Sequence, residues 1–450
     1  MSVDTQPAPA GSEDAAAPGE RPAGDKKPGL GIGFARHLSS TGLANLGDGV
    51  FQTGMPLVAL SLTRSPAQIA LLAAANWLPW LLGGMAAGVL VDRHDRRVVR
   101  ATALASRAAL LTAALALVVT GHMNMSLLVA VALLYGTAEV FTDLSGSALV
   151  PDLVQRGQLQ AANGRLIAVE TVANSFLGSP VAGFLVAFGA GWIFGIPAAL
   201  AVGAAFLALS IRGNFRHASH HGAQRPLAQV REGLRFVVRH PVIRPLTIAG
   251  GLMNMASTGY FAVFIVWAVG KGSRLGMSQP AWSLSMVVFA VGAISGSLLT
   301  GPVLKRLPEL PVMFGGWLSG GVLMLVPVLW PSVPVWFVVV FLLALTNTIG
   351  NVLTQSLRQR VVPAAMLGRV TGASRTLGFG LMPVGAVLGG VVAEHWSLET
   401  TFIGGALISI VSALYPTLVV KRTTVAAAEA DAEAAAEAAA EAAVSPAAGA

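Results

Sequence analysis

Long apolar stretches alternate with short polar or charged segments along most of this chain. A helix rises about 1.5 Å per residue and the hydrocarbon core of a bilayer is about 30 Å thick, so about 20 mostly apolar residues can span it. Twelve stretches meet this requirement, and each predicts a membrane-spanning helix. They cover residues 34–62, 67–91, 101–120, 125–148, 165–188, 191–212, 242–270, 280–304, 310–330, 334–357, 369–393 and 397–420.

The composition supports a lipid environment. Charged residues make up 11% of the chain and its mean hydropathy is +0.69, whereas soluble domains are about 25% charged. A chain so poor in charge cannot cover a water-exposed surface, and this predicts an all-α integral membrane protein. The chain contains no cysteine, which excludes disulfides, thiolate metal sites and cysteine nucleophiles.

The basic residues between the predicted spans give the orientation. If the N-terminus is cytosolic, the cytosolic segments hold most of the arginines, including Arg93, Arg96, Arg97 and Arg100, and the outer loops hold only Arg64, Lys271 and Arg274. This bias predicts that both termini are cytosolic. The net charge of +8 then faces anionic lipid, and a nucleic-acid partner is not expected.

The spacing of the spans divides the chain into two halves of six helices. The predicted units are a disordered cytosolic tail (1–33), an N-terminal half (34–212), a cytosolic central loop with a surface helix at 227–238 (213–241), a C-terminal half (242–420) and an Ala/Glu-rich cytosolic tail (421–450). The halves echo each other, because the pairs Gly84/Gly88 and Gly292/Gly296 recur about one half apart. Tandem halves around a cavity are typical of secondary transporters. The last tail is either a solvated helix or disordered, and no function is assigned to it.

Two motifs suggest moving helices. The first, between the second and third spans, consists of Gly84, Gly88, Asp92, Arg93, Arg96 and Arg97. Its glycines are expected to let another helix approach closely, and its arginines to pair with Asp92 and with carbonyls of a neighbouring helix end, which would latch a cytosolic gate. The alternative is a plain positive-inside anchor.

The second motif is Gly178, Pro180 and Gly183 in the fifth span, where proline bends the helix and small residues allow tight packing. The alternative is an ordinary kink.

Few ionisable residues lie within the predicted spans. The acids are Asp48, Glu139, Asp143 and Glu170, and the clear base is Arg107. Such residues face the bundle interior or a water-filled path, and desolvation suits a carboxyl group to proton exchange. Asp48 and Glu139 are the proton-coupling candidates. Asp143 is a third candidate, and its alternative role, which we favour, is a structural ion pair with Arg107. Glu170 is expected to pair with Arg165 or a loop arginine.

Polar and aromatic residues within the spans are candidates for a substrate cavity, with interhelical contacts as the alternative. They are Gln52, Asn76, Trp77, Trp80, Asn174, Asn254, Tyr260, Phe261, Asn347 and Asn351. The sequence indicates no catalytic residues, metal site or cofactor. It has no phosphate-binding G-x-x-x-x-G-K-[ST] loop, so ion coupling is expected in place of ATP.

The segment from Gly84 to Arg97 resembles the loop 2–3 signature of the major facilitator superfamily, G-x-x-x-D-R-x-G-R-R/K, with Asp95 in place of a glycine. Gly178 to Gly183 resembles a weakened form of the superfamily's antiporter motif, G-P-x-x-G. The sequences Asn45-Leu-Gly-Asp48-Gly49, Leu78-Pro79, Leu149-Val-Pro151-Asp-Leu153 and Leu367-Gly-Arg-Val370 resemble the macrolide-efflux and siderophore-exporter branch, which includes bacterial multidrug exporters.

The resemblance implies a major facilitator fold in the cell membrane, with the first and fourth helices lining a central cavity. It also implies proton-coupled export of amphipathic compounds, with Asp48 as part of the pattern. Many proton-coupled drug exporters carry an arginine in the fourth helix, whereas this chain has Tyr135, Gly136 and Glu139 there.

The leading hypothesis is therefore a monomeric proton antiporter that exports amphipathic drugs or a secondary metabolite. The alternatives are a proton-coupled symporter for nutrient uptake and a non-transporting membrane receptor.

Overall fold

The computed structural model describes residues 30–213, 215, 226–363 and 366–444. The predicted N-terminal tail therefore lies almost entirely outside the described residues. The twelve predicted stretches coincide with helices, and in the described chain ten helical segments are long and apolar enough to cross a membrane. Two further long helices, α1 (Gly31–Leu62) and α2 (Pro66–Arg93), belong to the same bundle.

The first half contains α1, α2 and the elements up to residue 209. The others are α3 (Arg96–Val119), α4 (Met125–Leu153), η1 (Arg156–Gln158), α5 (Leu159–Thr171), the π-helix η2 (Val172–Gly178), α6 (Ser179–Phe188) and α7 (Trp192–Leu209). The elements α5, η2 and α6 form one continuous span.

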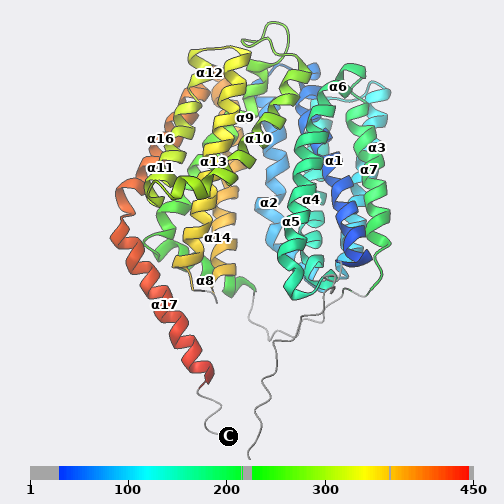
Figure 1. The fold of residues 1–450 in the computed structure, drawn as a ribbon. Coiled ribbons are helices and arrows are strands. Elements are labelled where there is room, and N and C mark those ends of the chain that lie inside the picture. The colour runs from blue at the N-terminus through cyan, green and yellow to red at the C-terminus, as the bar shows by residue number, and fades with distance from the viewer. Residues whose placement is uncertain (1–29, 214, 216–225, 364–365, 445–450) are drawn as a thin grey trace, which may run out of the picture.

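The second half follows α8 (Pro226–Arg239), the predicted surface helix. It contains α9 (Ile243–Ala268), α10 (Gln279–Leu304), α11 (Glu309–Leu323), α12 (Val326–Leu329), α13 (Val333–Val361), α14 (Leu367–Gly380), α15 (Met382–His395) and α16 (Leu398–Val419). The Ala/Glu-rich segment forms the helix α17 (Arg422–Val444), which leaves the bundle at a steep angle (Figure 1).

The outer surface of the bundle is apolar. Leu82, Phe206, Leu298 and Leu418 each leave more than 70% of their area exposed. A water-soluble surface does not carry so many exposed large apolar side chains, so this surface faces lipid. Backbone polar groups are satisfied inside the helices, as the hydrocarbon core requires.

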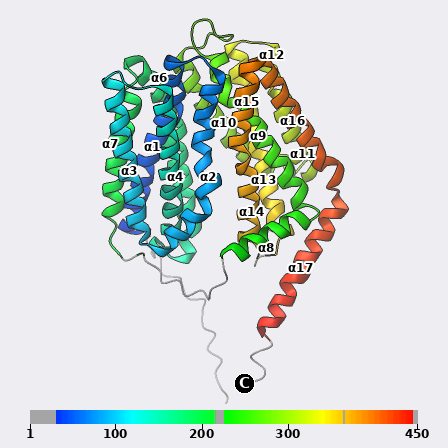
Figure 2. The same ribbon diagram turned by 180° about the vertical axis from the view of Figure 1, so that it is seen from behind.

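The two halves meet at one end of the bundle. We call this end the loop side; there residues 63–65 join α1 to α2 and residues 269–278 join α9 to α10. The opposite end, where α1 begins and α8 and α17 lie, is the tail side. Close packing joins α2 to α15 and α6 to α10. Figure 2 shows the same two groups of helices from behind, with α8 and α17 at the tail side of the second group.

Candidate functional site

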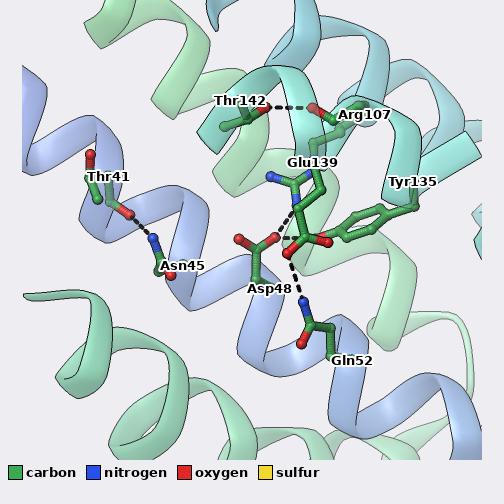
Figure 3. Close-up of polar contacts among 9 residues, drawn as sticks. Thr41, Asn45, Asp48, Gln52, Arg107, Tyr135, Glu139 and Thr142 are labelled. Atoms are coloured by element: carbon green, nitrogen blue, oxygen red, sulfur yellow. Dashed lines mark hydrogen bonds and ion pairs between the residues drawn. The ribbon is translucent and has the colours of Figure 1, made fainter. Parts of the chain in front are cut away.

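Two hydrogen-bonded pairs of side chains connect α1 and α4 in the middle of the first half (Figure 3). Tyr135 donates its hydroxyl hydrogen to Oδ1 of Asp48. Nε2 of Gln52 donates to Oε1 of Glu139 at 3.1 Å. Residues four apart lie on the same face of a helix, so Asp48 and Gln52 share one face of α1, and Tyr135 and Glu139 share one face of α4. The two helices run in opposite directions, and the two hydrogen bonds therefore cross between them.

Arg107 of α3 contacts both members of the pair formed by Asp48 and Tyr135. Its guanidinium forms an ion pair with Oδ1 of Asp48 and lies 4.2 Å from the centre of the Tyr135 ring. Arg107 is 2% exposed and Asp48 is 7% exposed. The expected ion pair of Arg107 with Asp143 is therefore wrong, because α3 places the guanidinium beside α1.

The network leaves two buried polar atoms unpartnered among the described residues. Both Oε2 of Glu139 and Nε of Arg107 are buried and have no hydrogen-bond partner. A buried polar group without a partner costs free energy and is rare in folded proteins. This cluster is therefore a place where a bound proton or an ordered water changes the energetics.

Sequence analysis missed a second buried base. It placed Arg100 in a cytosolic loop, but Arg100 lies in the second turn of α3 and is 3% exposed. It donates to the carbonyl oxygen of Thr142 at 3.0 Å and to Oγ1 of Thr41 at 2.9 Å. The clue was the amphipathic continuation of the third span to residue 96. Gly146 makes the position possible, since a Cβ there would lie 2.0 Å from the guanidinium.

A cavity of about 420 Å³ opens beside this network in the tail-side part of the bundle. It is lined by α1, α2, α3, α4 and α5 of the first half and by Arg375 of α14 in the second half. Asp48 and Asp143 both line it. The two halves therefore share one chamber, which the packing at the loop side closes at the far end.

Asp143 and Glu170 present free carboxylates to this cavity. Neither makes a hydrogen bond or ion pair within the described part of the chain, and both are lining residues. The expected pairing of Glu170 with Arg165 or a loop arginine is therefore not present. His37 also lines the cavity, is 1% exposed, and leaves its Nδ1 without a partner among the described residues.

Most of the predicted cavity residues lie elsewhere. Among the ten, Trp80 lines the chamber. Tyr260 is 1% exposed and donates to the carbonyl oxygen of Met324 at 3.1 Å, so it belongs to the core. Asn254 joins α9 to α14 by donating to the carbonyl oxygen of Gly378 at 3.1 Å.

Asn76, Trp77, Asn174, Phe261, Asn347 and Asn351 are not among the residues that line this cavity. Oδ1 of Asn76 is buried without a partner among the described residues, and Trp77 faces Phe379 across the two halves at 6.1 Å. The exposed side chain of Asn351 donates to Oδ1 of Asn347 at 2.8 Å on α13. Phe261 is 37% exposed, and the carbonyl of Asn174 accepts from Ser179.

No group of three or more His, Asp or Glu residues with metal-binding geometry occurs within the described side chains.

The family model of the Major Facilitator Superfamily matches residues 38–382 and 272–447 of this chain. These matches cover most of the sequence. The chain belongs to the major facilitator superfamily. It is accordingly a multi-pass membrane transporter.

Curated relatives are superfamily exporters at low identity. The chain is 28% identical over 393 residues to the enterobactin exporter EntS of Citrobacter koseri, covering 85% of this chain and 89% of the relative. It is 26% identical over 388 residues to the multidrug efflux pump Tap of Mycobacterium tuberculosis, covering 82% and 89%.

Solved superfamily structures share the fold. The nucleoside transporter NupG has a TM-score of 0.71 at 14% identity, over 87% of this chain and 100% of that one. A bacterial homologue of the iron transporter ferroportin, in an inward-facing state, has a TM-score of 0.68 at 15% identity, over 86% and 98%.

The superfamily's loop 2–3 motif holds together the tail side of the first half. Arg96 donates to the carbonyl oxygen of Ala148 and to Asp152 at the end of α4, at 2.9 and 3.0 Å. Arg97 donates to the carbonyl oxygen of Ile211 after α7 at 2.9 Å, and Asp95 accepts from two backbone amides as the N-cap of α3. Asp95 therefore begins the helix where the family usually has a glycine.

Other parts of this motif differ from expectation. Gly84 and Gly88 do not support a close helix contact, because a Cβ on either would meet nothing within 4 Å. The matching glycines Gly292 and Gly296 of α10 do so, with carbonyl oxygens of α13 at 2.4 Å from a Cβ. Arg93 is exposed, and the side chain of Asp92 lies outside the described residues.

The antiporter-like motif in the fifth span contacts both neighbours. Gly178 packs against Leu46 and Gly49 of α1, and Gly183 packs against Ser283 and the start of α10 in the other half. The π-helix η2 ends at Gly178, and Ser179 is its C-cap, next to Pro180. Oγ of Ser179 accepts from Thr53 at 2.9 Å. Proline and small residues thus place this span between α1 and the second half.

Proposed function

We propose that this chain exports amphipathic small molecules by proton-coupled antiport through alternating access. In this proposal α1 and α2 also span the bilayer, giving twelve spans, and the tail side with both termini is cytosolic. The observation that carries the proposal is the buried cluster of Asp48, Arg107, Tyr135, Gln52 and Glu139 beside a cavity lined by both halves.

Export as the direction is supported by the relatives, whose names describe an enterobactin exporter and a multidrug efflux pump. The basic residues of the tail side favour a cytosolic location for it, since Arg93, Arg96 and Arg97 lie there. The cavity then faces the cytosol, which is where an exporter binds its substrate.

The ion pair of Asp48 supports proton coupling. As a carboxylate, Asp48 holds Arg107 and accepts from Tyr135. A proton on Asp48 removes the charge that holds the guanidinium, and Arg107 is then free to reorient toward Glu139 or the cavity. Glu139 has one buried oxygen without a described partner, so a proton there removes a charge that is poorly stabilised. Asp143 lies four residues after Glu139 on the same face of α4, and it lines the cavity.

Coupling requires that proton and substrate favour different conformations. Here contacts between the halves close the loop side, and the cavity lies in the tail-side part of the bundle. The proposal is that deprotonation favours substrate binding from the tail side, and that protonation from the loop side favours the return.

The test uses the full chain in liposomes containing a pH-sensitive dye. Addition of a transported compound to vesicles with an imposed pH gradient should produce counterflow of protons. We expect Asp48→Asn and Glu139→Gln each to abolish the coupled proton flux. Asp431→Asn, which makes the same chemical change on α17 outside the bundle, should leave it intact.

If Asp48→Asn and Glu139→Gln both retain gradient-driven flux, the proposed coupling sites are wrong. If substrate and protons move in the same direction, the protein is a symporter. Resistance of a sensitive host expressing the chain, lost on addition of an uncoupler, is the expected cellular result.

A further inference from the structure

The cavity carries its free charges on opposite walls. Asp143 of α4 and Glu170 of α5 belong to the first half, and Arg375 of α14 belongs to the second. Within the described chain none of these three side chains has a hydrogen bond or ion pair. Arg375 is exposed and its guanidinium lies 5.6 Å from the ring centre of Phe379 on its own helix.

The other ionisable lining groups are already engaged or buried. Asp48 is held by Arg107. Arg100 is 3% exposed and donates to neutral oxygens of Thr142 and Thr41, so it forms part of the first-half wall. Its positive charge interacts with Asp143 and Glu170 and offsets part of theirs, which leaves this wall with an excess of negative charge. His37 is 1% exposed. A ligand in the cavity therefore meets two carboxylates on one side and one guanidinium on the other.

Apolar side chains fill the wall between these charges. Trp80, Leu144, Leu166 and Ile167 line the same space. Its volume of about 420 Å³ lies within the range of about 300–1,000 Å³ that is typical of sites for drug-sized ligands. The shape and lining suit a compact molecule with an apolar body.

Charge complementarity then selects the ligand class. An organic cation would satisfy Asp143 and Glu170 but leave Arg375 facing it unpaired. An organic anion would satisfy Arg375 and be repelled by the two carboxylates. Leaving a partly desolvated charge without a partner weakens binding. A molecule with an ammonium at one end and a carboxylate at the other pairs with both walls.

We propose that this cavity binds zwitterionic amphiphiles, with the cationic group at Asp143 and Glu170 and the anionic group at Arg375. The assignment rests on the proposed function, because it treats the cavity as the substrate site of the transporter. It adds the substrate class and names Arg375 as a specificity-determining residue.

The test measures binding of one scaffold in three charge states to the purified full chain in detergent. The probes are norfloxacin, which is zwitterionic near neutral pH, its cationic methyl ester and its anionic N-acetyl derivative, followed by equilibrium dialysis. The dipeptide Trp-Phe, its methyl ester and its N-acetyl form provide a second scaffold. We expect the zwitterion of at least one scaffold to bind about tenfold more tightly than both of its derivatives.

Variants separate the two walls. Arg375→Gln should weaken zwitterion binding about tenfold and leave binding of the ester unchanged, and Arg375→Lys should restore part of the loss. Asp143→Asn combined with Glu170→Gln should weaken zwitterion and ester but not the N-acetyl form. Arg360→Gln and Asp431→Asn make the same chemical changes outside the cavity and should bind like the unaltered chain.

The proposal is overturned if an ester binds as tightly as its parent zwitterion, if Arg375→Gln leaves the preference unchanged, or if neither scaffold binds in any form. Failure of the proposed function looks different. Charge-selective binding without proton-coupled flux would overturn antiport and support the site, whereas coupled flux of a compound without charge selectivity would overturn the site alone.

Discussion

The two halves share a helical plan but differ in what they bury. The first half buries an ion pair between Asp48 and Arg107, with Tyr135 as a further donor. The second half instead buries a cluster of rings near the loop side: Phe264 stacks on Trp336 at 4.3 Å, and Trp282 lies parallel to Trp336 at 6.3 Å.

This difference separates two tasks. Gain or loss of a proton changes the net charge of the first cluster, while the aromatic cluster keeps the same energy over the physiological pH range. Trp336 is also fixed by donation from Nε1 to Oγ of Ser285 at 2.9 Å. Under the proposed function, the first half responds to protons and the second provides the surface against which the first half moves.

The largest effect on the difference between the halves is expected when the buried cation of the first half is removed. Arg107→Met leaves Asp48 buried without its partner, and we expect the free energy of unfolding to fall by about 3–5 kcal/mol. Unfolding in mixed micelles, followed by tryptophan fluorescence, measures it. The double variant Asp48→Asn/Arg107→Met should recover much of the loss. Equal losses in the single and double variants would contradict a significant ion pair.

The matching change in the second half is Trp336→Phe. It removes the hydrogen bond to Ser285 and part of a ring that is 1% exposed, at a cost of about 1–3 kcal/mol in unfolding free energy. Proton-coupled flux per folded molecule should be unchanged. A selective loss of coupling, with stability preserved, would mean that the aromatic cluster takes part in the proton response.

The junction of the halves gives a third test. Oε2 of Glu394 on α15 accepts from Oγ of Ser65 at 2.8 Å and from the amide of Ala67 at 3.3 Å at the start of α2. Glu394→Gln should weaken this exposed contact by about 1 kcal/mol and open the loop side about fivefold more often.

Because the chain has no cysteine, Ala70→Cys provides a single reporter beside Gly390. Labelling by an impermeant maleimide should rise in Glu394→Gln. The matched control is Glu399→Gln, whose carboxylate accepts from Trp267 within the second half. A rise of the same size in this control would show that the effect is not specific to the junction.

A smaller, local effect is expected where α8 meets α9. Nδ1 of His240 accepts from the amides of Val242 and Ile243 at 3.2 and 3.1 Å. Burial lowers the pKa of His240, partly offset by the carbonyl of Val361 and by Asp431.

Protonation of His240 is therefore disfavoured in the folded state. The local stability is complete above the usual histidine pKa of about 6.5 and is lost as the pH falls below it. Amide hydrogen exchange at Val242 and Ile243 should lose protection at pH 5.5 relative to pH 7.5, after correction for intrinsic rates. The variant His240→Gln should show no such pH dependence, and an unchanged protection factor in the native chain would refute the assignment.

The smallest effect concerns α17, which only the second half carries. Arg360 of α13 bonds to Glu429 of α17 at 2.7 Å and to Glu309 at 2.6 Å, but its side chain is 43% exposed. Exposed ion pairs contribute about 0–1 kcal/mol, so Arg360→Gln should change unfolding by less than about 1 kcal/mol. Loss of more than 2 kcal/mol would mean that α17 is integral to the second half.

The sequence predicted the helices well because their signal is local. Runs of apolar residues, with breaks at Ser65-Pro66 or at Gly189, mark where each span begins and ends. The same runs concealed Arg100, because a charge near the end of an apolar stretch has the same pattern whether it enters the helix or lies in a loop. The predicted acids Asp48 and Glu139 were identifiable, since a carboxyl group within a span is rare.

The contact partners of these side chains could not be identified from the sequence. We expected Arg107 to pair with Asp143, because both lie in the same half of their predicted spans, but the rotation of α3 directs Arg107 to Asp48. Tyr260 and Trp80 are both aromatic residues within spans, yet one lies in the core and the other at the cavity. Helix rotation and the gap between the halves decide such cases, and neither leaves a periodic signal along the chain.

The sequence by itself determined that this chain is a bundle of membrane helices, because transfer of an apolar segment into lipid depends on that segment alone. It also determined which carboxyl groups lie within the spans. Only the tertiary structure decided that Arg107 pairs with Asp48, that Asp143 and Glu170 have no hydrogen-bond or ion-pair partner in the described chain, and that Arg375 of the other half lines the same cavity. Electrostatic pairing depends on distances between helices far apart in sequence, and packing alone sets those distances.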